Sequence, residues 1–164
     1  MKEQANDGWD QLPTELKDDM LIRVFRELSI VKDNTRLLIL VTNGFLELLV
    51  NRLIETKTKN AKKISSNGQS FPYATKLLIL NEIGIISDDD YKVFEWFRKL
   101  RNKSAHLPVF EATKNELKQL SDQQYHDPAN VYNLCTIFIG GFWNGHIEVF
   151  GPVFAPGATG NTKK

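Results

Sequence analysis

The stretch RLLILVTNGFLELLVNRLIE, residues 36–55, is long, strongly apolar and free of proline. The sequence Asp-Asn-Thr at 33–35 directly precedes it, and each of these residue types can cap the N-terminus of a helix. We therefore predict a long central helix that continues to about Thr56. Asn43 and Glu47 interrupt its apolar run, which is too short to span a bilayer, so we interpret it as a helix buried in a protein core.

Apolar spacing and helix-boundary residues predict further helices on both sides of this one. Four helices and one short helical piece are expected, at 13–28, 72–84, 88–106, 128–150 and 112–120. Ser87 is a natural N-cap for the helix that follows it, and Pro108 should end that helix near His106. The sequence thus predicts the all-α class, as a bundle of about five helices.

Composition and length predict a single soluble domain. The chain has 164 residues, of which 41% are apolar and 25% are charged, as is ordinary for a globular protein. We expect a flexible N-terminus at 1–12, one helical domain at 13–150 and a flexible Gly/Pro-rich tail at 151–164. Because Cys135 is the only cysteine and no targeting segment is visible, we expect a cytoplasmic protein without membrane attachment.

The formal net charge is +1, which excludes a general basic field for nucleic-acid binding. Any such binding would need a local patch. The segment 57–70 has no apolar periodicity, so we interpret it as a flexible connection. Its lysines, together with one in the fourth helix, are candidates for contact with an RNA backbone, the alternative being a solvated loop: Lys57, Lys59, Lys62, Lys63 and Lys103.

The C-terminal half of the helix at 88–106 combines core residues with an arginine. On a helical wheel Phe94, Phe97 and Leu100 share one apolar face, and Arg101 and Ser104 fall in the same sector. An isolated buried guanidinium is very costly. We therefore expect Arg101 to point inward and to meet a partner or an interface, with Ser104 in support.

Asn102 and His106 are four residues apart and lie on a neighbouring face of the same helix. Their positions alone also fit an ordinary helix end, where a histidine is favoured by the helix dipole. Arg101 and His106 need not meet within one chain. A second copy of the helix packed against the first would bring them to one phosphate more easily.

The string LRNKSAH, residues 100–106, resembles the signature motif of the HEPN superfamily, with Arg101, Asn102 and His106 at the motif positions. The longer stretch at 76–106 is similar to the mannitol-operon repressor family. The superfamily resemblance implies a dimeric helical bundle that is often a metal-independent ribonuclease of toxin-antitoxin, phage-defence or RNA-processing systems. It further implies that His106 moves a proton, Arg101 stabilises charge on the phosphate and Asn102 orients the histidine or the substrate.

Two features leave the activity open. Many toxin members carry a tyrosine two residues after the histidine, where this chain has Pro108, so the modification of that tyrosine by an antitoxin is not expected here. The mannitol-repressor relatives are regulators without assured nuclease activity. The alternatives to an RNA-cleaving homodimer are therefore a non-catalytic regulator and a helical interaction module, each with a possible protein partner.

Polar residues on the central helix form a stripe along one side: Arg36, Asn43, Glu47 and Asn51. The stripe is either the solvent side of that helix, or Glu47 turns inward and forms an ion pair with Arg101. The acidic run at 88–90 is explained by capping and by the helix dipole. We therefore expect neither a metal nor a cofactor.

Overall fold

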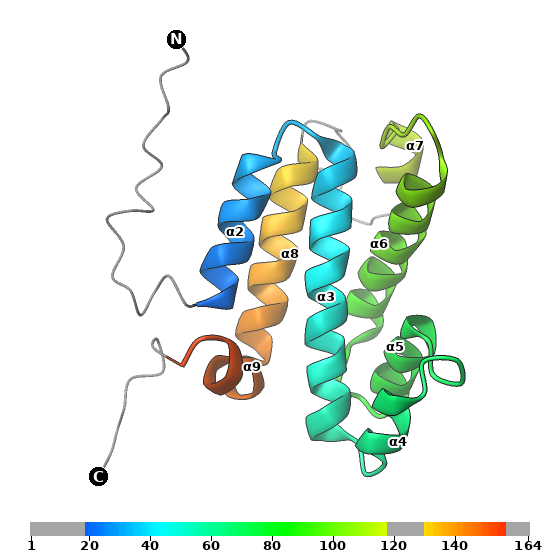
Figure 1. The fold of residues 1–164 in the computed structure, drawn as a ribbon, viewed down its shortest axis with the longest axis vertical. Helices are drawn as coiled ribbons and strands as arrows, with labels where there is room; N and C mark the ends of the chain where they lie inside the picture. Colours follow the sequence, from blue (N-terminus) through cyan, green and yellow to red (C-terminus); the bar gives the residue numbers. More distant parts are fainter. Residues whose placement is uncertain (1–18, 118–129, 157–164) are drawn as a thin grey trace.

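The structure, a computed structural model, describes residues 19–117 and 130–156, and every regular element in these ranges is a helix (Figure 1). The all-α class is confirmed, but the described residues form eight helices rather than about five. They are α2 (Met20–Ile30), α3 (Thr35–Lys57), α4 (Ala61–Ser66), α5 (Tyr73–Glu82), α6 (Asp88–His106), α7 (Lys114–Leu117), α8 (Val131–Gly145) and α9 (Ile147–Phe154). The predicted starts of the first and last helices, at Pro13 and Pro128, lie outside the described residues, as does segment 1–12.

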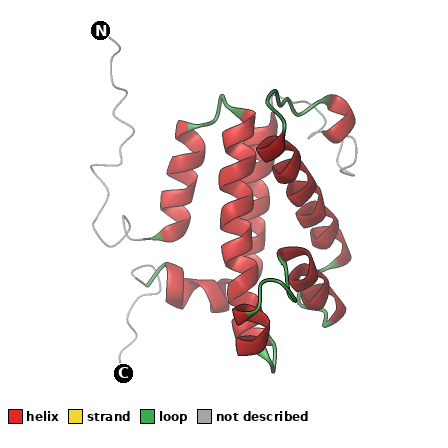
Figure 2. Ribbon diagram, turned by 45° about the vertical axis from the view of Figure 1, so that its right-hand side comes forward, coloured by secondary structure: helices red, strands yellow, loops and turns green. Residues whose placement is uncertain are grey.

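Helix α3 is the centre of the fold, because α2, α4, α5, α6, α8 and α9 all pack against it (Figures 1 and 2). Its predicted boundaries are confirmed, with Asn34 as N-cap accepting a hydrogen bond from the Leu37 backbone N–H at 3.1 Å. By length and composition α3 could also cross a bilayer, but 56% of its most apolar stretch is buried within the described structure. That burial fits the core helix of a helical bundle.

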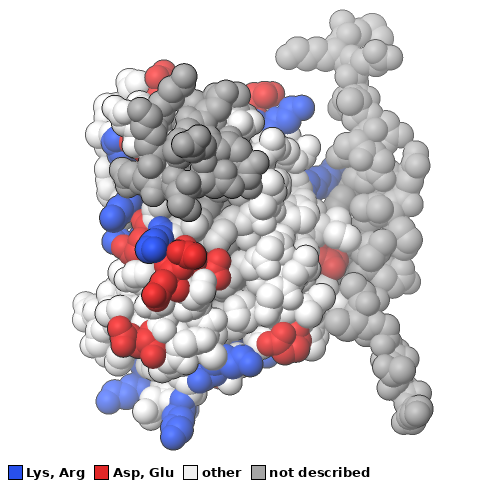
Figure 3. All heavy atoms as spheres, turned by 180° about the vertical axis from the view of Figure 1, so that it is seen from behind, with Lys and Arg blue, Asp and Glu red and all other residues white. Residues whose placement is uncertain are grey.

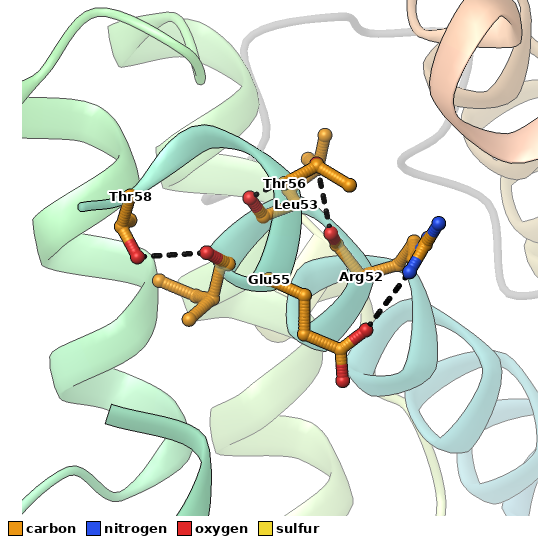
Figure 4. A network of polar contacts seen from close by, with 6 residues as sticks. Arg52, Leu53, Glu55, Thr56 and Thr58 are labelled. Atoms are coloured by element: carbon orange, nitrogen blue, oxygen red, sulfur yellow. Dashed lines mark hydrogen bonds and ion pairs between the residues drawn. The ribbon is translucent and has the colours of Figure 1, made fainter. Parts of the chain in front are cut away.

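Hydroxyl groups reinforce the C-terminal end of α3 (Figure 4). Thr56 Oγ1 donates to the carbonyl of Arg52 at 2.9 Å, and Thr58 Oγ1 donates to the carbonyl of Ile54 at 2.7 Å. The Arg52 guanidinium also bonds the Glu55 carboxylate at 3.2 Å. These local contacts satisfy polar groups where the helix ends.

The expected flexible connection at 57–70 is wrong in its middle, where the chain forms the six-residue helix α4. Ile64 explains the difference, because this one apolar side chain is 7% exposed and packs into the core. A single buried anchor leaves no periodicity to detect in the sequence. Helix α4 is stabilised by tertiary packing rather than by an amphipathic pattern of its own.

Helices α5 and α6 form an antiparallel hairpin joined by a turn at Gly84. Gly84 has φ +73°, a left-handed conformation that glycine adopts without strain, and the Ile85 and Ile86 N–H groups donate to the Leu80 carbonyl. Ser87 then caps α6 by accepting from the Asp90 N–H at 3.1 Å. The hairpin places the start of α5 opposite the C-terminal half of α6.

The expected single last helix is divided at His146 into α8 and α9. The His146 ring packs against Phe142 at 4.9 Å and Phe150 at 5.8 Å between centroids, so the break brings aromatic side chains of both helices together. Figure 1 shows α9 lying across the end of the bundle. Helix α9 continues to Phe154, so the first four residues of the expected tail belong to the folded domain.

Aromatic rings fill the core between α6 and α8. Phe94 is fully buried and meets Phe138 and Phe142 edge-on, with centroids 5.2 and 4.8 Å apart. Cys135 is buried nearby in α8, and this burial raises the pKa of its thiol to about 12. A thiol that stays protonated and enclosed has a packing role.

Candidate functional site

The polar stripe of α3 faces α5 and the end of α6 instead of solvent, so interpreting it as the exposed side of α3 is wrong. At one end Arg36 Nη2 donates to the carbonyls of Leu107 and Pro108 at 2.8 and 3.1 Å. At the other end Asn51 Oδ1 accepts from Lys76 Nζ of α5 at 2.8 Å. The stripe therefore joins α3 to the α5–α6 hairpin.

Between these two contacts lies a pocket of about 230 Å³, which we call the α3–α5–α6 pocket. Helix α3 forms one wall, the start of α5 forms another, and the C-terminal half of α6 forms the third. The lining residues are Asn43, Glu47, Pro72, Tyr73, Ala74, Arg98, Arg101 and Asn102. Two residues of the predicted motif, Arg101 and Asn102, thus share a pocket with Glu47.

Arg101 is exposed at this pocket, so the expectation that it points into the core is wrong. The residues of the same sector on either side of it, Leu100 and Ser104, are buried. Arg101 instead reaches the pocket beside the start of α5. Its guanidinium donates to the Asn102 Oδ1 at 3.2 Å.

Glu47 does turn toward the pocket, but it forms no ion pair with Arg101. Within the described part of the chain, the Glu47 carboxylate makes no hydrogen bond or ion pair, and Arg101 has no carboxylate partner. The two charges line the same pocket without neutralising each other. They are both available to a molecule that enters it.

Two buried polar atoms of the lining residues, Asn43 Oδ1 and the Tyr73 hydroxyl, have no hydrogen-bond partner within the described structure. Asn43 is only 3% exposed. Burial raises the pKa of Tyr73 well above its ordinary value, and the nearby carboxylates of Glu47 and Glu95 raise it further. The Tyr73 hydroxyl therefore stays protonated.

The second arginine of the pocket, Arg98, is already paired. Its Nε and Nη2 donate to the two carboxylate oxygens of Glu95, each at 2.8 Å. These hydrogen bonds hold the pKa of Glu95 below its usual range and raise the pKa of Arg98. Arg98 thus helps to fix the wall of the pocket, and Arg101 is the cation that remains free to bind an anion.

His106 is exposed at the last position of α6 and does not line the pocket. It follows Arg101 by five residues, which places the two side chains about 140° apart around the helix and about 7.5 Å apart along it. Ser104 is 1% exposed, and its hydroxyl donates to the Arg101 carbonyl at 2.8 Å. One chain therefore does not bring the three motif side chains and Ser104 to a single point.

The five candidate lysines are all exposed and lie away from the pocket lining. Lys57 approaches Glu148 of α9 at 3.8 Å, and Lys103 forms an ion pair with Glu116 of α7. Figure 3 shows basic side chains gathered at the end of the molecule where α4 lies, and basic and acidic side chains mixed on the face above it. None of the five lysines lines the α3–α5–α6 pocket with Arg101.

Reasoning from sequence did not single out Tyr73 or Arg98 as site residues. Arg98 precedes Arg101 by three residues, so helical spacing places them on neighbouring positions of one face. Tyr73 carries no comparable signal, because only the α5–α6 hairpin brings the start of α5 to this part of α6. Among the described residues, no group of three or more His, Cys, Asp or Glu side chains gathers as a metal site.

Searches with this chain find no matching family model, no matching curated protein and no matching solved structure.

Proposed function

We propose that the protein is a homodimeric, HEPN-like endoribonuclease that cleaves RNA without a metal ion, with Arg101 and His106 as its working residues. The observation that carries the proposal is the state of Arg101. Its side chain is exposed at the mouth of a polar pocket and has no carboxylate partner in the described structure. A guanidinium in this state suits a phosphate, which it can bind with two parallel hydrogen bonds.

The chemistry follows from the two side chain types. His106 removes the proton from a ribose 2′-hydroxyl, and the 2′-oxygen attacks the adjacent phosphorus while the bond to the 5′-oxygen breaks. The leaving 5′-oxygen takes up a proton, and the products are a 2′,3′-cyclic phosphate and a 5′-hydroxyl. Arg101 stabilises the charge that builds on the phosphate, and Asn102 holds the guanidinium through its amide oxygen.

Two copies of the chain are needed, because Arg101 and His106 point in different directions from one helix. Pairing of two α6 helices about a two-fold axis lets Arg101 of one copy meet His106 of the other. The exposure of both side chains is compatible with this arrangement. A role in toxin-antitoxin or phage-defence systems, an antitoxin partner and a cytoplasmic location are part of the same proposal.

Purified protein is tested with single-stranded and structured RNAs in excess EDTA. The wild type should give fragments with 2′,3′-cyclic ends, and Arg101→Ala and His106→Ala should each abolish them. Arg23→Ala is the matched control, since Arg23 is an exposed arginine on α2 and lies outside the pocket. Intact RNA across a broad panel would overturn the proposal and favour the non-catalytic regulator.

Mixing the two inactive variants tests the shared site. A heterodimer of Arg101→Ala with His106→Ala contains one complete pair and one empty pair if the pairs form between copies. Random exchange of subunits at equal concentrations should then restore about a quarter of the wild-type activity. No recovery, with subunit exchange verified by mass spectrometry, would show that the two residues do not act across a dimer interface.

A further inference from the structure

The imidazole of His106 has no partner in its own chain that would orient it. The side chain is exposed at the last position of α6, and within the described structure it makes no hydrogen bond, ion pair or ring contact. A histidine that removes a proton with one ring nitrogen is usually held by a hydrogen bond from its other ring N–H to a carboxylate or carbonyl. The proposed nuclease site therefore needs an acceptor for this second nitrogen.

Most side-chain oxygens around the α3–α5–α6 pocket are not available as that acceptor. Asn102 Oδ1 already accepts a hydrogen bond from Arg101. Both carboxylate oxygens of Glu95, which lies nearby on α6, accept from an arginine of the same helix. Asn43 Oδ1 and the Tyr73 hydroxyl are enclosed by the protein, so a group that enters the pocket does not reach them.

Glu47 is the acceptor that remains. Its side chain is half-buried on α3, and within the described residues its carboxylate makes no hydrogen bond or ion pair. The carboxylate oxygens are not enclosed as Asn43 Oδ1 is. A half-buried charge without hydrogen bonds is costly, and a group that donates to it reduces that cost. Because Glu47 and Arg101 line the same pocket, a donor that approaches Arg101 also comes close to Glu47.

We infer that Glu47 is a positioning residue of the proposed nuclease site, and that its carboxylate accepts a hydrogen bond from His106 of the other copy. The inference rests on the proposed function, which brings His106 of one copy to Arg101 of the other. His106 takes the proton of the 2′-hydroxyl with one ring nitrogen while its other ring N–H donates to Glu47. The carboxylate also stabilises the imidazolium that forms. Each site of the dimer thus combines Glu47 and Arg101 of one chain with His106 of the other.

Cross-linking of the full-length protein tests this geometry without any need for cleavage. Glu47→Cys on a tagged chain and His106→Cys on an untagged chain are mixed and treated with a short bismaleimide. A covalent dimer of one tagged and one untagged chain should form, while the buried Cys135 should not react. Glu55→Cys in place of Glu47→Cys is the matched control and should give much less of this dimer, because Glu55 is an exposed glutamate of the same helix outside the pocket.

Enzyme kinetics separate a positioning role from a role in folding. Glu47→Gln keeps the size of the side chain but removes its charge, so kcat should fall about 10- to 100-fold. KM should stay within about threefold of the wild-type value, since Arg101 still binds the phosphate. Glu55→Gln should leave both constants unchanged. An unchanged kcat in Glu47→Gln would overturn the inference.

Mixing with the inactive variants assigns Glu47 to one half of the shared site. A heterodimer of Glu47→Gln with His106→Ala contains one complete site, so about a quarter of the wild-type activity should return after random subunit exchange. A heterodimer of Glu47→Gln with Arg101→Ala contains none, because each of its two sites lacks one of these residues. The opposite pattern would place Glu47 beside His106 of its own chain and overturn the inference.

The cross-links also separate this inference from the proposed function. Arg101→Cys with His106→Cys reports on the proposed dimer itself. If this pair is joined and the pair of Glu47→Cys with His106→Cys is not, the inference is overturned and the proposed dimer stands. If neither pair is joined, both are overturned. If both pairs are joined but no RNA is cleaved, the position of Glu47 is supported and the nuclease proposal is overturned.

Discussion

Replacement of Asn43 by leucine should make the protein more stable, although Asn43 lies in the middle of the central helix. The side chain is 3% exposed, and Oδ1 has no hydrogen-bond partner in the described structure. Leucine has the same branched skeleton of four side-chain heavy atoms, carries no polar atom and is a better helix former than asparagine.

The size of the effect can be worked from these contacts. A buried acceptor without a partner costs about 1–3 kcal/mol, and the higher helix propensity of leucine adds a few tenths of a kcal/mol. Some of this gain is lost, because Asn43 faces a pocket and leucine leaves part of its apolar surface there. We expect the free energy of unfolding to rise by about 1.5 kcal/mol, which corresponds to about 4 °C in Tm for a chain of this length.

Urea unfolding followed by circular dichroism measures the change, with Asn51→Leu as the matched control. Asn51 lies on the same side of α3, but its Oδ1 accepts a hydrogen bond from Lys76 Nζ at 2.8 Å. Its replacement removes a satisfied contact and should lower the free energy of unfolding by about 1 kcal/mol. The two substitutions are chemically identical, so their opposite signs would isolate the missing partner of Asn43.

A loss of stability in Asn43→Leu, equal to that in Asn51→Leu, would refute this reasoning. It would mean that the Asn43 amide is satisfied in solution, for example by a bound water, and that its role is structural.

Three further predictions concern the fold. Phe94→Ala removes a fully buried ring between Phe138 and Phe142 and should lower the free energy of unfolding by about 3–4 kcal/mol in urea titrations; a loss below about 1 kcal/mol would contradict the described core. Gly84→Ala should cost about 1 kcal/mol through its φ of +73° alone, because an added Cβ meets nothing within 4 Å, and Gly84→Asn should cost less. Burial lowers the pKa of His146, so the unfolded chain binds more protons than the folded one, and the free energy of unfolding should fall as the pH drops from 7 through the ordinary histidine pKa of 6.5. His146→Gln should flatten this part of the plot of unfolding free energy against pH, and an unchanged slope would contradict the prediction.

The helix boundaries that could be predicted are those made by neighbouring residues. Asn34 and Ser87 cap α3 and α6 by accepting from N–H groups three residues later, and Gly84 allows the turn after α5. These contacts depend only on residue type and spacing within one or two turns. The starts of α3 and α6 and the end of α5 follow from them directly.

The boundaries that could not be predicted depend on distant residues. Helix α4 forms around Ile64 because the core accepts that side chain, and α8 is divided from α9 where His146 packs between Phe142 and Phe150. Nothing in the local sequence distinguishes α4 from a loop, or the pair α8 and α9 from one continuous helix. Their conformations are set by the surfaces against which they pack.

For the candidate site, the sequence by itself determined which side chains were available, and the tertiary structure decided which of them meet. Helical spacing placed Arg101 on the apolar sector of α6 and Glu47 on the polar stripe of α3. What Arg101 meets depends on the neighbouring helices, because α5 begins with Tyr73 beside Asn43 and Arg98, and the three helices enclose a pocket there instead of core. Periodicity specifies the direction in which a side chain leaves its helix, but only the ends and packing of the neighbouring helices specify what it finds there.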